Sequence, residues 1–193
     1  MGSDRTTYTL SEFKGQIGPV SISIGNIVVK GPTKAAPPAR VIVQYVTERG
    51  RLISPATDAL YYVPLELIKM FAARAGEAGM TTLKIRVLVN PEASMRKQTK
   101  NRVTLGTAFV EDNKAEVYWK NIYWQKGDSL LRQTFLSVVA HEVGHLVHYN
   151  AVGDSGFYST PRIEREYAAE RFVELVLGKE YVRPVEGKFY KGY

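Results

Sequence analysis

Cysteine is absent from this chain of 193 residues, and histidine occurs only three times. The absence of cysteine excludes disulfides, thiolate catalysis and every zinc site that uses cysteine ligands. Any metal ion would therefore have to be held by His, Asp or Glu. The three histidines all lie within one stretch, "HEVGHLVHYN", at residues 141–150. This clustering poses the main question of the sequence: a metal site, or a helix with structural histidines.

Long apolar runs are absent as well, so we expect no transmembrane segment. The first residues, "MGSDRTTYTLSEFKGQ", contain no apolar core of the kind that signal peptides carry. We therefore expect a chain without a signal peptide, cytoplasmic or associated with a virus particle rather than secreted, although the compartment itself is unknown. The hydrophobic content of 45% and the length of the chain allow a sizeable core.

Acidic residues are in the minority, with 19 Asp and Glu against 26 Lys and Arg and a net charge of +7. Such a balance favours contact with a polyanion or nucleic acid through a basic surface. The densest basic stretch is "MRKQTKNR", residues 95–102. A solvated basic loop explains this stretch better, and no signature of a nucleic-acid-binding module accompanies it.

The first third of the chain has the pattern of a small β element. Strand-like runs lie at residues 19–24, 26–30 and 40–48, and the Pro- and Gly-rich segment 31–40 resembles a linker. We therefore expect an N-terminal β element over residues 1–50 and a second unit over residues 60–193.

The second unit is predicted to contain both helices and strands. Helical spacing of apolar residues predicts a helix over residues 64–79, and alternation predicts a strand over 82–89. Two more strands are expected at residues 102–110 and 115–124, joined by a turn at 111–114. Without a regular alternation of strands and helices, the fold class is expected to be α+β with a small mixed or antiparallel sheet.

Two further helices complete the prediction. A long helix, capped by Asp128 or Ser129, is expected to run to about Tyr149, with "GDSG" at residues 153–156 breaking it. The last helix is expected to begin near Pro161, with Thr160 as its cap, and to end before Gly178.

The long helix carries the residues with the clearest chemistry. His141 and His145 are four residues apart and therefore share one helix face, where two imidazoles can bind one metal ion. Glu142 lies about 100° around the helix, outside that ligand set, where it can hold a water molecule and take its proton. Gly144 indicates that something approaches the helix closely. The alternative is a buried helix whose histidines are satisfied structurally.

His148 requires a separate interpretation. It lies near the same face, two turns after His141, but three ligands along one straight helix cannot easily converge on one ion. We expect His148 either to contact a ligand residue from outside the metal shell or to be a polar residue at the helix end, where histidine interacts well with the helix dipole.

The third ligand is expected to be a carboxylate from a later element, because no other histidine remains. The last helix offers several glutamates. Glu166 falls inside its apolar arc, where a carboxylate needs a metal or a cation as a partner. Glu170 lies at the edge of that arc and is expected to accept a hydrogen bond from a ligand histidine. Alternatively, Glu166 forms a salt bridge with Arg162 or Arg165.

Together these motifs resemble the gluzincin metallopeptidases, whose active-site helix carries His-Glu-x-x-His and whose next helix supplies a Glu ligand. The segment "EYAAERF", residues 166–172, is similar to the second-helix motif of the lethal factor and Pro-Pro endopeptidase group. The resemblance implies a zincin-like fold and one catalytic zinc ion held by His141, His145 and Glu166, with Glu170 as the second Glu of the motif.

The same resemblance implies a tyrosine that stabilises the oxyanion. Tyr158, eight residues before Glu166, is close to the position of that tyrosine, although a core tyrosine in a loop explains it equally well. The segment between His145 and Glu166 is shorter than in the lethal factor group, and residues 1–60 match nothing in it. Substrate specificity therefore does not carry over. Peptidases that cleave immunity repressors, with His-Glu-x-Gly-His and a later Glu, are also similar.

The expected function is that of a zinc metalloendopeptidase with Glu142 as the general base. A polypeptide substrate would lie along a sheet edge at residues 102–110 or 115–124. The aromatic residues of the second stretch, Tyr118, Trp119 and Trp124, would form subsites or belong to the core. Two alternatives are a zincin-fold structural or assembly module, as in a virus particle, and a peptidase associated with nucleic acid.

Overall fold

The computed structural model describes residues 23–24, 27–28, 36–47, 49–89, 104–125 and 130–183. The first half of the expected linker (31–35), the basic stretch at 95–102 and the expected caps Asp128 and Ser129 lie outside these residues, as does the side chain of Trp124. The strands are β1 (Ser23–Ile24), β2 (Ile27–Val28), β3 (Arg40–Val46), β4 (Leu52–Ile53), β5 (Thr82–Leu88), β6 (Gly106–Phe109) and β7 (Lys114–Tyr118). The helices are α1 (Leu65–Glu77), α2 (Trp119–Gln125), α3 (Leu131–Ser159) and α4 (Arg162–Leu177), followed by a short 3-10 helix, η4 (Lys179–Tyr181).

A mixed five-stranded sheet forms the base of the molecule, in the order β4-β3-β5-β7-β6. The three inner strands run parallel, whereas β4 and β6 pair antiparallel at the two edges. The chain is therefore a mixed helix-and-sheet protein, as expected from the sequence. β1 and β2 form a separate antiparallel pair within the N-terminal region where short strands were expected.

Helix α1 connects β3 to its parallel neighbour β5, which is the crossover that parallel strands require. The expected division of the chain at about residue 50 falls between β3 and β4. These two strands pair with each other in the same sheet as β5. Residues 40–53 are thus built into the main sheet.

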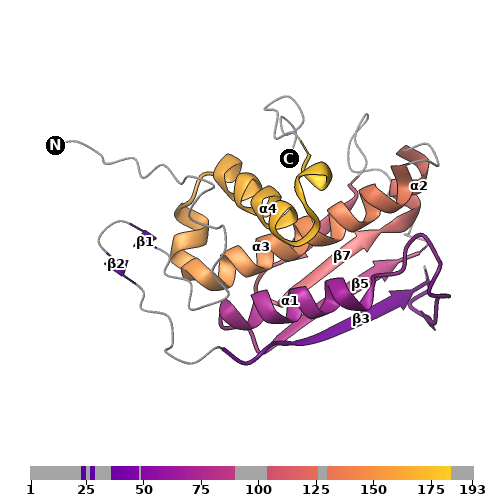
Figure 1. The fold of residues 1–193 in the computed structure, drawn as a ribbon, viewed down its shortest axis with the longest axis horizontal. Coiled ribbons are helices and arrows are strands. Elements are labelled where there is room, and N and C mark those ends of the chain that lie inside the picture. The colour runs from indigo at the N-terminus through magenta and orange to yellow at the C-terminus, as the bar shows by residue number, and fades with distance from the viewer. Residues whose placement is uncertain are drawn as a thin grey trace.

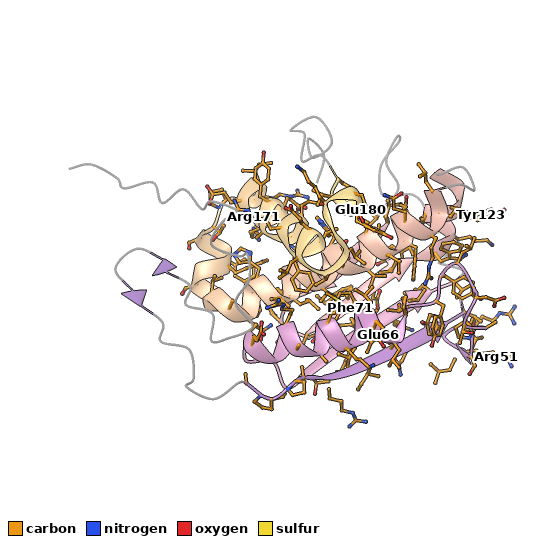
Figure 2. The ribbon with its side chains drawn as sticks, viewed as in Figure 1. Arg51, Glu66, Phe71, Tyr123, Arg171 and Glu180 are labelled. Atoms are coloured by element: carbon orange, nitrogen blue, oxygen red, sulfur yellow. The ribbon has the colours of Figure 1, made fainter. Side chains whose placement is uncertain are left out.

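One face of the sheet is covered by α1 and α3, and α4 packs on α3 from the side away from the strands (Figure 1). The alternating residues of β5 that face these helices, Leu83, Ile85 and Val87, are fully buried. Figure 2 shows Phe71 reaching inward from α1, and its ring centroid lies 6.1 Å from that of Phe172 on α4. The core therefore joins the sheet to α1, α3 and α4.

The strand predicted over residues 115–124 is wrong in its second half. Strand β7 ends at Tyr118, and helix α2 begins at Trp119. The aromatic and β-branched residues favoured a strand, but Trp119 and Ile122 are three residues apart and both are buried, which fits a helical turn. Asn121, also buried, donates from Nδ2 to the Thr104 carbonyl at 2.7 Å and fixes this turn.

Helix α3 extends beyond its predicted end and is broken at the predicted place. Gly153 has φ 74° and ψ 172°, a conformation outside the helical region that glycine adopts without strain. A short helical segment then continues to Ser159. Thr160 does not cap α4 as predicted: it ends α3, where its hydroxyl donates to the Gly156 carbonyl at 2.7 Å, and Pro161 directly precedes α4.

Candidate metal centre

Helix α3 carries polar side chains into the interior of the molecule. His141 and Glu142 are buried together with most of the apolar residues around them, and His145 follows one turn later. Burying such groups is costly unless each has a partner. Because α3 lies between the sheet and α4, those partners must come from neighbouring elements.

Helix α4 supplies Glu166, the partner shared by both histidines. The Nε2 atoms of His141 and His145 lie 3.1 Å apart, and Glu166 Oε2 lies 3.1 Å from the first and 3.6 Å from the second. Ligand atoms about 2.0–2.1 Å from a tetrahedral zinc ion are separated by about 3.3 Å. The three atoms therefore have the mutual spacing of three ligands on one zinc ion, and these residues form a group that could hold a metal.

The hydrogen bonds of His141 direct a lone pair toward this group. Its Nδ1 lies 2.7 Å from Glu170 Oε1, a carboxylate oxygen that can only accept when ionised. In a neutral ring the proton is thereby held on Nδ1, and Nε2 then faces Glu166 Oε2 as one acceptor facing another. Either a proton on Nε2 or a metal ion between the two atoms removes this conflict, and the contact expected between Glu170 and a candidate ligand histidine is present.

The hydrogen bonds within this group also shift the pKa values of Glu166 and His141. Burial raises the pKa of Glu166, but hydrogen bonds with His141 and His145 outweigh burial and hold this pKa well below its usual range. Burial lowers the pKa of His141, whereas hydrogen bonds to Glu166 and Glu170 raise it, with a net increase. The site thus attracts positive charge, which a proton or a metal ion can supply.

Glu170 is itself held by the segment that follows α4. Arg183 donates its backbone N–H to Glu170 Oε2 at 2.8 Å, and Arg183 Nη2 lies 3.2 Å from Oε1. The same segment is attached to α3, where Ser137 Oγ donates to the Tyr181 carbonyl at 2.9 Å. These contacts hold the carboxylate that orients His141, and no motif in the sequence pointed to Arg183.

Gly144 explains how α4 comes close enough to supply Glu166. A Cβ added at Gly144 would lie 3.0 Å from Ala169 Cα and 3.0 Å from Phe172 Cβ. The absence of a side chain therefore lets the backbones of α3 and α4 approach each other one residue before His145. The close approach expected from the sequence is confirmed, and the approaching element is α4.

Glu142 lies apart from the three candidate ligands, beside strand β6. A Cβ added at Gly106 would lie 2.7 Å from both Cγ and Oε1 of Glu142, so the carboxylate rests directly on the strand backbone. Glu142 is not a member of the group that could hold a metal. Its role as a general base stays a prediction.

His148 and Tyr158 have contacts of other kinds. The His148 ring packs against Phe157 with centroids 5.4 Å apart, and burial, followed by the charges of His145 and Arg165, lowers its pKa to about 4. Tyr158 is 54% exposed, and its hydroxyl donates to Glu111 at 3.2 Å. Among the described contacts, none joins either residue to the three candidate ligands, so the roles assigned to them stay predictions.

The alternative partner of Glu166 is present as well. Arg162 Nε lies 3.8 Å from Glu166 Oε1, the oxygen that faces away from the histidines. This long and partly exposed contact is weak compared with the paired histidines on Oε2. Glu166 therefore contacts the two histidines through Oε2 and Arg162 through Oε1.

Comparisons of the chain with protein-family models, curated proteins and solved structures give no match. Within the part of the chain that the structure describes, no helix is both long and apolar enough to cross a membrane.

Proposed function

We propose that this chain is a zinc-dependent metalloendopeptidase with a zincin-like fold of the gluzincin type. The observation that carries the proposal is the convergence of His141 Nε2, His145 Nε2 and Glu166 Oε2 at 3.1–3.6 Å from one another. Three protein ligands leave a fourth tetrahedral position open, which is typical of catalytic rather than structural zinc sites. Glu142, the residue after His141 on the same helix, is not part of this group.

A bound zinc ion would polarise the scissile carbonyl and make a water molecule more acidic. Glu142 would accept the proton of the attacking water at its carboxylate and pass it to the departing amine nitrogen. Glu170 would keep His141 in the tautomer that presents Nε2 to the ion, because Glu170 Oε1, 2.7 Å from Nδ1, would accept the Nδ1 proton. Arg183 would in turn orient Glu170.

Strand β6 is the edge along which the substrate would lie. Of the two edges considered from the sequence, β7 is paired on both sides, whereas β6 is the outermost described strand. An extended peptide added antiparallel or parallel to β6 would pass beside Gly106 and hence beside the Glu142 carboxylate. Tyr118 and Trp119 are only 6% and 9% exposed, so they belong to the core and we do not assign them to subsites.

Metal content is the measurement that tests this proposal. Elemental analysis of the purified chain should give about one zinc per chain, with marked loss in Glu166→Ala and none in the matched control Glu164→Ala. Glu164 is an exposed glutamate on the same helix. A chain that takes up no zinc even after reconstitution would leave three structural histidines and overturn the proposal.

A further inference from the structure

A small cavity lies directly beside the candidate ligands. It has a volume of about 110 Å³ and is lined by His145, Phe157, Arg162, Arg165 and Glu166. Two of these residues are candidate zinc ligands, so a group bound in the cavity would lie next to the reacting atoms. The volume suits a small planar group rather than a large side chain.

The charges around this cavity favour an anion. Its lining contains two guanidinium groups and one carboxylate, that of Glu166. When Glu166 binds a metal ion, its negative charge is matched by that ion, and the guanidinium group of Arg165 remains as a positive charge at the cavity. Arg162 lies 3.8 Å from Glu166 Oε1 and is partly exposed.

The guanidinium group of Arg165 is held in place by the ring of Phe157. Its guanidinium carbon lies 4.8 Å from the centroid of the Phe157 ring, a stacking that fixes the plane of the group. Within the described part of the chain, Arg165 Nε is a buried donor without a hydrogen-bond partner. A buried guanidinium donor without a partner is rare and indicates a missing acceptor.

These observations depend on the break in α3 at Gly153. The short helical segment after Gly153 brings Phe157 back onto the preceding turns, where its ring contacts His148 and Tyr149 with centroids 5.4 and 5.3 Å away. Phe157 thereby forms one wall of the cavity and supports Arg165. The break thus has a role in building this side of the site.

We propose that this cavity binds a carboxylate of the peptide substrate. A guanidinium group matches a carboxylate with two parallel hydrogen bonds, which explains why Arg rather than Lys lines the cavity. The carboxylate could belong to an acidic side chain beside the scissile bond or to the C-terminus of the substrate. This inference rests on the proposed peptidase function and adds the substrate class.

Binding of three small probes to the zinc-loaded chain separates the two sources. N-acetyl-glutamate amide carries only a side-chain carboxylate, N-acetyl-glutamine only a main-chain carboxylate, and N-acetyl-glutamine amide carries neither. We expect N-acetyl-glutamine amide, which has no carboxylate, to bind at least about tenfold more weakly than the tighter-binding of the other two probes. Calorimetry or NMR titration measures the binding. Equal binding of all three probes would overturn the proposal.

Two variants show whether the cavity binds the probe. Arg165→Gln should weaken binding of the preferred carboxylate about tenfold or more, and Arg165→Lys should restore only part of it. The matched control is Arg171→Gln, because Arg171 lies on the outer surface of α4 (Figure 2). Zinc content and unfolding temperature should match the parent in all three variants. Unchanged binding in a folded, zinc-loaded Arg165→Gln would overturn the proposal, because the probe would then be held elsewhere.

Cleavage of a peptide library separates failure of this inference from failure of the peptidase proposal. Peptides cut without preference for an acidic residue or a free C-terminus would support the peptidase and overturn the carboxylate cavity. Arg165-dependent binding of the probe to a zinc-loaded chain that cuts no peptide would support the cavity and contradict the peptidase.

Discussion

Glu142 is the residue whose chemistry can be separated from metal binding, because its carboxylate rests on Gly106 rather than among the candidate ligand atoms. Replacing it with Gln keeps the size and removes the base. We expect Glu142→Gln to lower kcat/KM by a factor of about 10² to 10⁴ while the zinc content stays at the parental level. The assay is peptide hydrolysis, with the exposed Glu164→Gln as control. Parental activity in Glu142→Gln would contradict its role as base.

His148 gives a prediction about acid stability. Burial lowers the pKa of His148 from 6.5 to about 4, so the unfolded chain binds its proton first as the pH falls. The stability contributed by the neutral ring is therefore complete above pH 6.5 and is lost as the pH falls toward 4. Urea unfolding at pH 7 and pH 4.5, with chelator present, should show a larger loss for the parent than for His148→Gln. Equal losses would place the pKa of His148 near its ordinary value.

At the scale of elements, the contact between α3 and α4 depends on the absence of a side chain at Gly144. Alanine favours a helix by about 1 kcal/mol over glycine, so propensity alone predicts that Gly144→Ala stabilises the chain. The added Cβ would lie 3.0 Å from Ala169 Cα, and backbone cannot move aside as a side chain can. We expect the crowding to outweigh propensity and to lower the unfolding free energy by about 1–2 kcal/mol. A higher melting temperature would contradict this expectation.

The helices and strands that could be predicted are those whose pattern of apolar residues lies within one segment of the sequence. Periodicity placed α1 and β5 within a few residues of their ends, and Glu166 was identified because it interrupts an apolar arc within α4. Helix α2 was missed because its strand-forming residues are held helical by tertiary contacts, among them the bond from Asn121 to Thr104. Thr160 was assigned to the wrong helix because a cap between two adjoining helices suits either one.

The parts of the site that the sequence could not reveal are those that depend on long-range contacts. Glu142 meets Gly106, and Glu170 meets Arg183, across separations at which no spacing rule applies. The cavity beside the ligands likewise needs the break at Gly153 to bring Phe157 against His148. A glycine signalled the break, but only the fold showed what the break brings together.

At the scale of the whole molecule, zinc should stabilise the folded chain by mass action. A ligand at one hundred times its dissociation constant adds about 2.7 kcal/mol to the unfolding free energy. For a chain of this size, this corresponds to a rise of roughly 5–10 °C in Tm. Thermal unfolding with zinc and with chelator should show this difference in the parent and little or none of it in His145→Ala. A shift of the same size in that variant would place zinc elsewhere on the chain.

The candidate ligands adjoin two further features. Glu142, the residue after His141, contacts the edge strand β6, and the cavity lined by Arg162 and Arg165 adjoins His145 and Glu166. If the substrate lies along β6 as proposed and its carboxylate binds Arg165, the position of that negative charge would set the position of the bond that is cleaved.

All three candidate ligands and Glu170 come from α3 and α4, two consecutive helices that meet at Thr160 and Pro161. A metal ion would therefore cross-link one helical hairpin and no strand. The loop that it closes, from His145 to Glu166, is short, so closing it removes little freedom from the unfolded chain compared with a link across the whole domain. During synthesis on the ribosome, the candidate ligands would leave the exit tunnel almost together and after every described strand of the sheet.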